Sequence, residues 1–304
     1  MNRVLIPFPA DIAQAATIAP SLGARIAPLA WHHFPDGESL VTLDHDLANA
    51  DVAILASLRD ADATALPLRF AAETAREFGA RTVGLIAPYL GYMRQDTRFQ
   101  PGQAVTSPLF ARFLEESFDW LVTVDPHLHR TPRLDALYRI PTAHVKSTPV
   151  VARWVAANVP NAILIGPDSE SEQWVASIAA DAGVPFQVLS KQRRGDYNVS
   201  VSLPDAAAAA GRTPVLVDDI VSSGRTILET QAHLQRLDLP APVLVAIHPV
   251  FSGDAYARLQ AANLASIVST DTIAHPSNAI AMGPELASAA SGLMTSRPAP
   301  LETP

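Results

Sequence analysis

The 304-residue sequence contains no cysteine, which excludes disulfide bonds, thiolate metal ligands and cysteine nucleophiles and fits a reducing compartment. It also has no uninterrupted apolar run that approaches the ~20 residues of a membrane span. Pro7, Pro9 and Asp11 interrupt the N-terminal segment, which therefore lacks the continuous apolar stretch of a signal peptide. We expect a cytoplasmic protein that does not associate with membranes.

Positive charge is scarce. The 22 Lys and Arg residues are outnumbered by 30 Asp and Glu residues, and the formal net charge is -8. This balance disfavours sequence-independent binding to nucleic acid or to anionic lipid. We expect neither partner, so an anionic ligand would have to be bound by local groups.

Short runs rich in Val, Ile and Leu recur along the chain, separated by segments with helical periodicity such as 63–80, 108–118 and 226–237. Runs of this length suit strands that are buried on both faces, and their alternation with helices predicts parallel βαβ units. We predict an α/β fold class. The apolar runs lie at 51–58, 81–90, 119–127, 161–168, 214–220, 241–249 and 265–272.

The length predicts about two domains at roughly 150 residues each. A proline-punctuated stretch at 139–150 is the expected boundary, with a series of strands and helices on either side. We predict an N-terminal α/β domain at 1–145, a C-terminal α/β domain at 146–285, and a C-terminal helix and tail at 286–304. The composition of 296–304 suggests a frayed end.

Polar residues follow the apolar runs directly. Ligands of parallel sheets bind beyond the carboxyl ends of the strands, so a site is expected at these positions. Any one of these residues could equally cap a helix or stabilise a turn, but together they favour a shared site. They are Asp125, His127, Asp168, Asp218, Asp219, His248 and Asp271.

The densest polar group lies at 215–226, in the sequence VLVDDIVSSGRT. Its hydroxyls and backbone N–H groups can wrap a phosphate at the start of a helix, and its paired carboxylates can bind ribose hydroxyls or Mg2+. A Ser/Thr cluster that only caps the helix is the structural alternative, and the paired aspartates favour the phosphate interpretation. The residues concerned are Asp218, Asp219, Ser222, Ser223, Gly224 and Thr226.

This segment resembles the ribose-5-phosphate loop of enzymes that handle phosphoribosyl diphosphate. Further segments match in order over nearly the whole chain, and they resemble the ribose-phosphate pyrophosphokinase (phosphoribosyl diphosphate synthetase) family, in motif style its archaeal branch. They are HFPDGES at 33–39, APYLGYMRQDTRFQPGQAVT at 87–106, VTVDPHLH at 122–129, GPD at 166–168, SKQRRGDYNVSV at 190–201 and HPVFSGDA at 248–255. The resemblance implies two similar domains of the type I phosphoribosyltransferase-like fold, each with a mostly parallel sheet flanked by helices, with catalysis at their junction.

The resemblance also implies an ATP site that is shared between subunits, and hence a homo-oligomer. Phe34 would stack on adenine in a neighbouring subunit, while Asp36 and Glu38 would accept hydrogen bonds around its amino group. The alternative is a plain surface turn at 35–37, which the turn chemistry of Pro-Asp-Gly favours by itself.

Further residues match the family's segments that bind ATP and metal. Arg94, Gln95 and Asp96 match an ATP-binding segment, where a guanidinium suits a phosphate or a purine face. The alternative is that Arg94 and Asp96 form an ordinary surface pair. His127 matches a histidine near the Mg-ATP phosphates, and Asp168 matches an acidic residue that helps to hold Mg2+; a match for His129 is weaker.

Lys191 and Arg193 match a catalytic loop whose cations close over the β-phosphate, and Arg194 would assist. By composition alone, this segment is a solvated basic patch. The activity implied is transfer of the β,γ-diphosphoryl group of ATP to the 1-hydroxyl of ribose 5-phosphate, which gives AMP and phosphoribosyl diphosphate. Asp218 and Asp219 would bind ribose hydroxyls and metal, and 222–226, including Arg225, would hold the 5-phosphate.

Three positions depart from the family's pattern. Arg225 and Glu170 stand where the family usually has glycine, and Thr97 stands where a basic residue is common. We hypothesise that Arg225 either adds a cation to the phosphate site or pairs with Glu170. The departures at Glu170 and Arg225 keep open the alternative of a catalytically weak regulatory or assembly paralogue that binds nucleotide. Another alternative is a phosphoribosyltransferase, which would keep the segment at 215–226 but would not need the segments around Phe34, Arg94 and Lys191.

Overall fold

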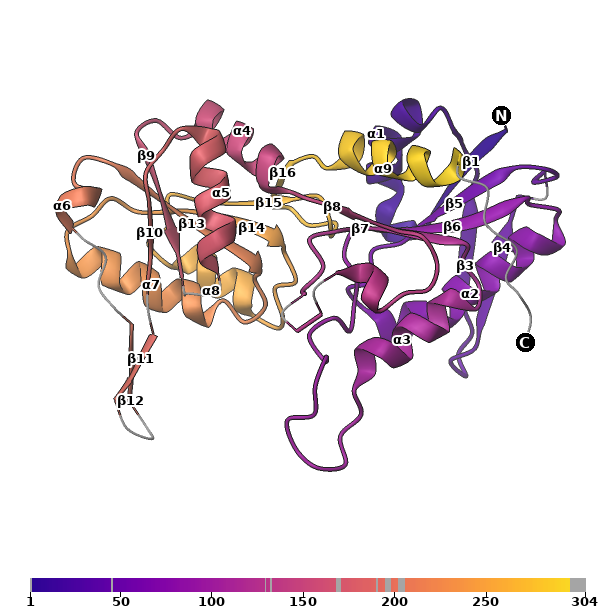
Figure 1. The fold of residues 1–304 in the computed structure, drawn as a ribbon, viewed down its shortest axis with the longest axis horizontal. Helices are drawn as coiled ribbons and strands as arrows, with labels where there is room; N and C mark the ends of the chain where they lie inside the picture. The colour runs from indigo at the N-terminus through magenta and orange to yellow at the C-terminus, as the bar shows by residue number, and fades with distance from the viewer. Residues whose placement is uncertain are drawn as a thin grey trace. The chain divides into compact units, whose positions relative to one another are not determined.

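The computed structural model describes residues 2–44, 46–128, 130–131, 133–167, 171–189, 191–194, 198–201 and 206–295. The chain divides into two compact units (Figure 1), one formed by Met1–Val145 with Gly283–Pro304 and the other by Lys146–Met282. The tail at 296–304, for which we predicted fraying, lies outside the described residues.

Unit 1 is built on a parallel sheet of strand order β2-β1-β5-β6-β7-β8, six-stranded among the described residues. The strands are β1 (Arg3–Pro7), β2 (Arg25–Ile26), β5 (Asp51–Leu55), β6 (Thr82–Ala87), β7 (Trp120–Val124) and β8 (Thr142–Val145). An antiparallel hairpin of β3 (Leu29–His33) and β4 (Ser39–Leu43) is inserted between β2 and β5. The helical elements are η1 (Pro9–Asp11), α1 (Ile12–Leu22), α2 (Ala61–Glu77), α3 (Thr106–Glu115), η2 (Leu134–Ala136) and α9 (Gly283–Thr295).

Unit 2 has a parallel sheet of order β10-β9-β13-β14-β15-β16, again six-stranded within the described residues. Its strands are β9 (Ala162–Gly166), β10 (Phe186–Val188), β13 (Thr213–Ile220), β14 (Val243–His248), β15 (Ser266–Thr270) and β16 (Asn278–Ile280). A hairpin of β11 (Lys191–Arg194) and β12 (Asn198–Val201) is inserted between β10 and β13. Its helices are α4 (Thr148–Asn158), α5 (Glu172–Ala182), α6 (Ala206–Ala209), α7 (Arg225–Arg236) and α8 (Ala255–Ala261).

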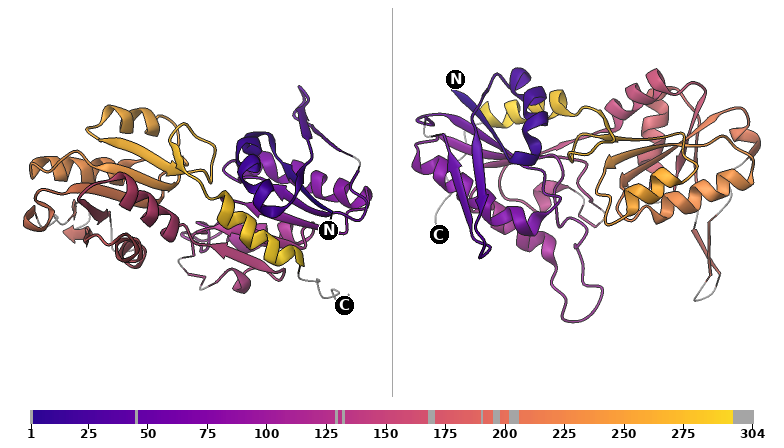
Figure 2. Two further views of the ribbon diagram at one scale, coloured as in Figure 1. Left: turned by 90° about the horizontal axis from the view of Figure 1, so that it is seen from above. Right: turned by 180° about the vertical axis from the view of Figure 1, so that it is seen from behind.

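The two units share one topology. In each, the second strand lies at the sheet edge beside the first, the later strands follow in order, and an antiparallel hairpin is inserted between the second and third strands. Both sheets are visible with their flanking helices in Figure 2. The predicted α/β class and parallel sheets are confirmed, and the hairpins that carry Phe34 and Lys191 occupy equivalent places.

The strands form where the sequence has continuous apolar runs, because the sheets are covered on both faces. Every residue of β5 and β9 is buried, and so is every residue of β14. The C-terminal helix α9 packs with unit 1, where Nη1 of Arg3 donates to Ser291 Oγ at 3.0 Å and to the carbonyl of Leu22 at 2.9 Å. No helix within the described residues has the length and hydrophobicity needed to cross a bilayer.

Candidate active site

The turn that follows β13 is held by hydrogen bonds to its backbone carbonyls. The N–H groups of Phe251 and Ser252 donate to the carbonyls of Val221 and Ser222 at 2.8 and 3.0 Å. The carbonyl of the next residue accepts a 3.0 Å bond from Nη2 of Arg258. The turn after β14 and helix α8 therefore fix the orientation of three consecutive peptide units.

The N–H groups of these three peptide units face the other way. The N–H and C=O of a trans peptide point in opposite directions. The N–H groups of Ser222, Ser223 and Gly224 therefore point away from the turn after β14 and from α8. Within the part of the chain that the structure describes, none of these N–H groups has a hydrogen-bond partner. Consecutive free N–H groups form a concave site of positive potential that suits an anion.

Helix α7 begins directly after this turn. Gly224 forms its N-cap with φ 68°, in the left-handed region that glycine adopts without steric cost. A Cβ at this position would lie 3.0 Å from Cδ1 of Leu259 on α8. The exposed Arg225 and half-buried Thr226 open the helix, whose N-terminal dipole adds to the positive potential of the turn. The structure thus brings the residues from Ser222 to Thr226 together in one turn at the start of α7, and the binding of an anion there stays a prediction.

Asp218 and Asp219 occupy the carboxyl end of β13 and are both half-buried. Asp218 is in register with Ala246 of β14, and Oδ1 of Asp219 accepts the N–H of Ile220 at 2.7 Å. Two carboxylates therefore precede the turn at 222–226 on the same strand end, and their role as ligands stays a prediction. Carboxylates at this point can accept hydrogen bonds from sugar hydroxyls or bind a hard cation.

Lys191 and Arg193 lie on β11, where they pair with Val201 and Val199 of β12. The sequence predicts a catalytic loop here, whereas the structure forms an antiparallel hairpin. Two valines at alternate positions favour a strand here, a signal that the basic residues obscure. The side chains of this hairpin lie outside what the structure describes, so the roles of Lys191 and Arg193 stay predictions.

The tip of the β3–β4 hairpin is a tight turn with Phe34 at its start. Phe34 N–H donates to the carbonyl of Glu38 at 2.8 Å, and Oδ1 of Asp36 accepts the N–H of Glu38 at 3.1 Å. The Phe34 ring is 41% exposed and meets the ring of His32 edge-on at 4.7 Å. The geometry is that of the surface turn which the sequence offers as an alternative. The exposed aromatic ring nevertheless provides a surface on which a base can stack.

Arg94, Gln95 and Asp96 lie in the loop between β6 and α3. Arg94 is exposed, whereas Oδ1 of Asp96 accepts a 2.9 Å bond from Arg130 and its side chain is only 7% exposed. The alternative in which Arg94 and Asp96 pair at the surface is therefore wrong. Oδ2 of Asp96 is buried without a partner among the described residues, so this carboxylate has an unused acceptor.

Asp125 follows β7 and contacts a residue that the sequence motifs do not include. Its Oδ1 lies 3.0 Å from Nε2 of His144, which is on the adjacent strand β8. Asp125 also has φ 30°, an uncommon backbone conformation for a residue with a side chain. His127, the predicted ligand, is half-buried two residues further on. The prolines around His144 indicate a domain boundary, and the sequence has no separate signal that places His144 near the end of a strand.

Some predicted residues lie elsewhere in the fold. His248 is 1% exposed, and its Nδ1 lies 2.9 Å from Thr272 Oγ1, while Oδ1 of Asp271 accepts the N–H of Met282 at 2.8 Å. These two strand-end residues serve the packing of unit 2, so the expectation that all of the strand-end residues share a site is too broad. Asp168, His129 and Glu170 lie outside the described residues.

No group of three or more His, Cys, Asp or Glu side chains that could hold a metal ion occurs among the residues the structure describes. Mg2+ is commonly bound through only one or two carboxylates, with water and substrate phosphates completing its shell. The carboxylates at the end of β13 therefore fit a Mg2+ ion that arrives with a phosphorylated substrate.

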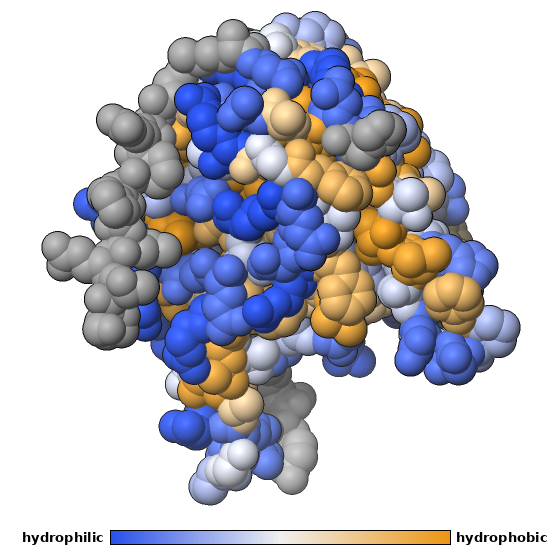
Figure 3. Space-filling model, turned by 90° about the vertical axis from the view of Figure 1, so that its right-hand side faces the viewer, coloured by the Kyte–Doolittle hydropathy of each residue, from blue (hydrophilic) through white to orange (hydrophobic). Residues whose placement is uncertain are grey.

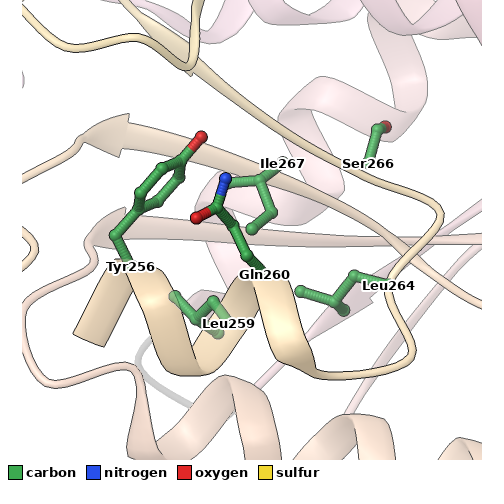
Figure 4. A pocket seen from close by; sticks show the side chains of 6 residues that line it. All are labelled: Tyr256, Leu259, Gln260, Leu264, Ser266 and Ile267. Atoms are coloured by element: carbon green, nitrogen blue, oxygen red, sulfur yellow. The ribbon is translucent and has the colours of Figure 1, made fainter. Parts of the chain in front are cut away.

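Two surface pockets lie apart from the predicted residues. One, of about 250 Å³, lies where Tyr256 and Gln260 of α8 project beside Ile267 of β15 (Figure 4). The other, of about 440 Å³, lies on unit 1 and is lined by residues that include Leu66 and Phe113. Neither contains a predicted site residue. The turn at 222–226 differs from both pockets in that its N–H groups have no hydrogen-bond partner among the described residues.

Two known families match this chain, one within unit 1 and the other within unit 2. Residues 5–117 match the family described as the N-terminal domain of ribose phosphate pyrophosphokinase, and residues 148–259 match the phosphoribosyl transferase domain. A ribose-phosphate pyrophosphokinase of Methanopyrus kandleri is 30% identical over 91% of this chain and 94% of its own. One of Halobacterium salinarum is 32% identical over 90% of this chain and 96% of its own.

A solved structure has the same fold. The phosphoribosylpyrophosphate synthetase of Mycobacterium smegmatis superimposes with a TM-score of 0.81 at 21% identity, covering 95% of this chain and 97% of the other. The similarity extends over both units, so the two-domain α/β architecture is that of a known enzyme.

Proposed function

Because the chain belongs to the ribose-phosphate pyrophosphokinase family, it transfers the diphosphoryl group of ATP to ribose 5-phosphate, and we propose that residues 222–226 bind the 5-phosphate. The observation that carries this assignment is that three consecutive N–H groups in the turn after β13 have no hydrogen-bond partner in the described part of the chain. A phosphate dianion can accept hydrogen bonds from several N–H groups at once, and the N-terminus of α7 adds its dipole.

Asp218 and Asp219 are proposed to bind the ribose hydroxyls and to share a Mg2+ ion with the substrate phosphates; Asp168 would contribute to the metal site. When bound, Mg2+ neutralises charge on the phosphate oxygens. The aspartates themselves orient the sugar, because each carboxylate can accept hydrogen bonds from neighbouring hydroxyls. Orientation is their main contribution, since the reaction depends on placing the 1-hydroxyl in line with the β-phosphorus.

The ATP-binding residues of unit 1 are proposed to be Arg94, Gln95, Asp96 and His127. The buried carboxylate of Asp96 accepts a hydrogen bond from Arg130, and its other oxygen, which has no partner within the described residues, suits an amino or hydroxyl group of the nucleotide. Arg94 is exposed and can reach a phosphate or a purine face. His127 would lie near the Mg-ATP phosphates.

Phe34, Asp36 and Glu38 are proposed to complete the ATP site of a partner subunit in a homo-oligomer. Their hairpin tip is exposed, so its aromatic ring is available to another chain. The same unit exposes further apolar side chains, among them Leu66 and Phe70 on α2, and hydrophobic residues reach the surface between hydrophilic ones on the face shown in Figure 3. Exposed apolar groups of this kind are consistent with subunit contacts. The cytoplasmic location stays a prediction.

Lys191 and Arg193 are proposed to be the catalytic cations. The 1-hydroxyl oxygen of ribose 5-phosphate bonds to the β-phosphorus of ATP as the bond from that phosphorus to the α,β-bridging oxygen breaks, and the hydroxyl proton is released. AMP leaves with the bridging oxygen. Charge on the transferred group is spread over its oxygens during this step, and fixed cations beside it lower the barrier.

The test is an assay with ATP, Mg2+ and ribose 5-phosphate in which AMP and phosphoribosyl diphosphate are both quantified. The sequence has only two lysines, so Lys146→Ala, which removes an exposed lysine elsewhere in unit 2, is a matched control for Lys191→Ala. Equal amounts of both products, lost only in Lys191→Ala, would support the proposal. ATP binding without product would instead favour a regulatory paralogue.

A further inference from the structure

We propose that Arg258 is a positioning residue for ribose 5-phosphate, because it fixes the Ser223–Gly224 peptide with its N–H directed at the 5-phosphate. The inference rests on the proposed assignment of that phosphate to residues 222–226. Arg258 lies outside the segments that resemble the family, and it acts on the substrate only through the backbone of the turn.

The guanidinium of Arg258 is held at two points. Nη2 donates to the carbonyl of Ser223 at 3.0 Å, and Nε donates to Oδ1 of Asp254 at 3.0 Å, one helical turn earlier. Because Asp254 is 75% exposed, this ion pair adds little stability of its own. The two bonds instead restrict the plane of the guanidinium, which in turn restricts the direction of the carbonyl.

The peptide between Ser223 and Gly224 needs such a restraint. Glycine accepts positive and negative φ with similar ease, so this peptide can rotate at low cost in a free turn. Rotation by half a turn would direct the carbonyl oxygen of Ser223, instead of the N–H of Gly224, towards the phosphate. The bond from Arg258 opposes that rotation, and Leu259, the next residue of α8, limits it further by packing against Gly224.

The effect of Arg258 on the orientation of the peptide can be distinguished from the effect of its positive charge. The side chain is 47% exposed and lies on the carbonyl side of the peptide, opposite the N–H groups, so its direct field at the phosphate is screened by solvent. Arg258→Lys keeps the charge but offers one ammonium group in place of a planar fork, so it cannot reproduce the restraint on the guanidinium plane.

The experiment measures kcat, the KM for ribose 5-phosphate, the KM for ATP and the melting temperature of Arg258→Met, Arg258→Lys and wild type. Arg236→Met is the matched control, because Arg236 is exposed at the end of α7 and has no hydrogen-bond or ion-pair partner among the described residues. We expect Arg258→Met to raise the KM for ribose 5-phosphate about tenfold, the effect of losing one well-directed hydrogen bond to an anion. The KM for ATP and the melting temperature should stay close to wild type, and Arg258→Lys should recover only part of the loss.

Asp254→Ala is a milder variant that releases one end of the guanidinium and should raise the KM for ribose 5-phosphate about two- to threefold.

Gly224→Ala distinguishes a failure of the role of Arg258 from a failure of the assignment of the 5-phosphate to residues 222–226. If Gly224→Ala raises the KM for ribose 5-phosphate and both Arg258 variants leave it unchanged, the role of Arg258 is wrong and the phosphate assignment stands. If none of these variants changes it, the phosphate assignment is wrong as well. Full recovery in Arg258→Lys would show a charge effect and overturn the positioning role.

Discussion

The carboxylate of Asp11 accepts the backbone N–H of Ser57 at 3.0 Å, which joins the loop after β1 to the loop after β5. By strand order, the loop after β5 in unit 1 corresponds to the loop after β13 in unit 2, where the N–H groups of 222–224 have no partner in the described chain. In unit 1, a buried carboxylate of the chain itself accepts one N–H at this end of the sheet, whereas the described part of unit 2 provides no such acceptor for the N–H groups of 222–224. This contrast supports placing ribose 5-phosphate in unit 2.

Replacement of Asp11 by Asn is expected to stabilise the protein at neutral pH. Burial raises the pKa of Asp11 from 3.8 to about 6, although the bond from Ser57 N–H acts in the opposite direction. The folded state thus holds the proton more tightly than the unfolded state, so the stabilising contribution is complete below pH 3.8 and is lost as the pH rises through 6. Asn keeps the acceptor oxygen for Ser57 and carries no charge.

The measurement is the free energy of unfolding by denaturant at pH 4 and at pH 7.5. We expect Asp11→Asn to exceed wild type by about 1–3 kcal/mol at pH 7.5 and to match it at pH 4. Asp181→Asn removes a carboxylate from the exposed surface of α5 and serves as the control. A difference between Asp11→Asn and wild type that is the same at both pH values would contradict the assignment of this effect to ionisation.

Gly84→Ala is expected to destabilise unit 1 strongly. Gly84 on β6 is in register with Trp120 on β7, and a Cβ at Gly84 would lie 1.8 Å from Cε2 of the indole. The two strands or the ring must move, at a cost of about 3 kcal/mol or more. In Gly292→Ala, on α9, the added Cβ meets nothing within 4 Å, so this control should gain about 0.5–1 kcal/mol. The measurement is the melting temperature of Gly84→Ala and of Gly292→Ala. Similar melting temperatures for the two variants would rule out the steric explanation.

The sequence predicts the parallel sheets and the position of the turn before α7, because both depend on local patterns. The apolar runs specify strands that are buried on both faces, and the residues from Ser222 to Thr226 combine hydroxyls with the glycine that starts α7. The sequence does not predict which side chains support those patterns. His144 meets Asp125 across two strands, and Arg258 reaches Ser223 from another helix, so both contacts depend on tertiary packing and leave no signal in residue spacing.

Mixing two inactive variants is expected to restore activity if the ATP site is shared between subunits. Phe34→Ala removes the aromatic ring from the site of the partner subunit, and Lys191→Ala removes the cation from the subunit's own site. In a mixed dimer, one site then carries both substitutions and the other carries neither. Random exchange of subunits would give about a quarter of the wild-type activity.

The mixing experiment uses subunit exchange under mild denaturant followed by the assay for AMP and phosphoribosyl diphosphate. Each variant refolded alone is the control for activity gained by refolding, and Lys146→Ala mixed with wild type controls for the exchange itself. Activity no higher than that of the separate variants, despite mixed oligomers detected by native mass spectrometry, would show that Phe34 serves its own subunit.

Replacement of Arg225 tests whether this departure from the family's glycine strengthens or obstructs the phosphate site. Its guanidinium is exposed and has no hydrogen-bond or ion-pair partner among the described residues, so the cation is available to a ligand. A cation beside a dianion at the surface is worth roughly 1 kcal/mol, so Arg225→Gly should raise the KM for ribose 5-phosphate about three- to tenfold. The salt dependence of that KM should also become weaker, because one screened charge has been removed.

Pairing with Glu170 makes a different prediction. If the two side chains form an ion pair, adding Glu170→Arg to Arg225→Glu should restore the activity that Arg225→Glu alone loses. A lower KM in Arg225→Gly would reject both hypotheses and show that the side chain hinders the approach of phosphate to the backbone N–H groups.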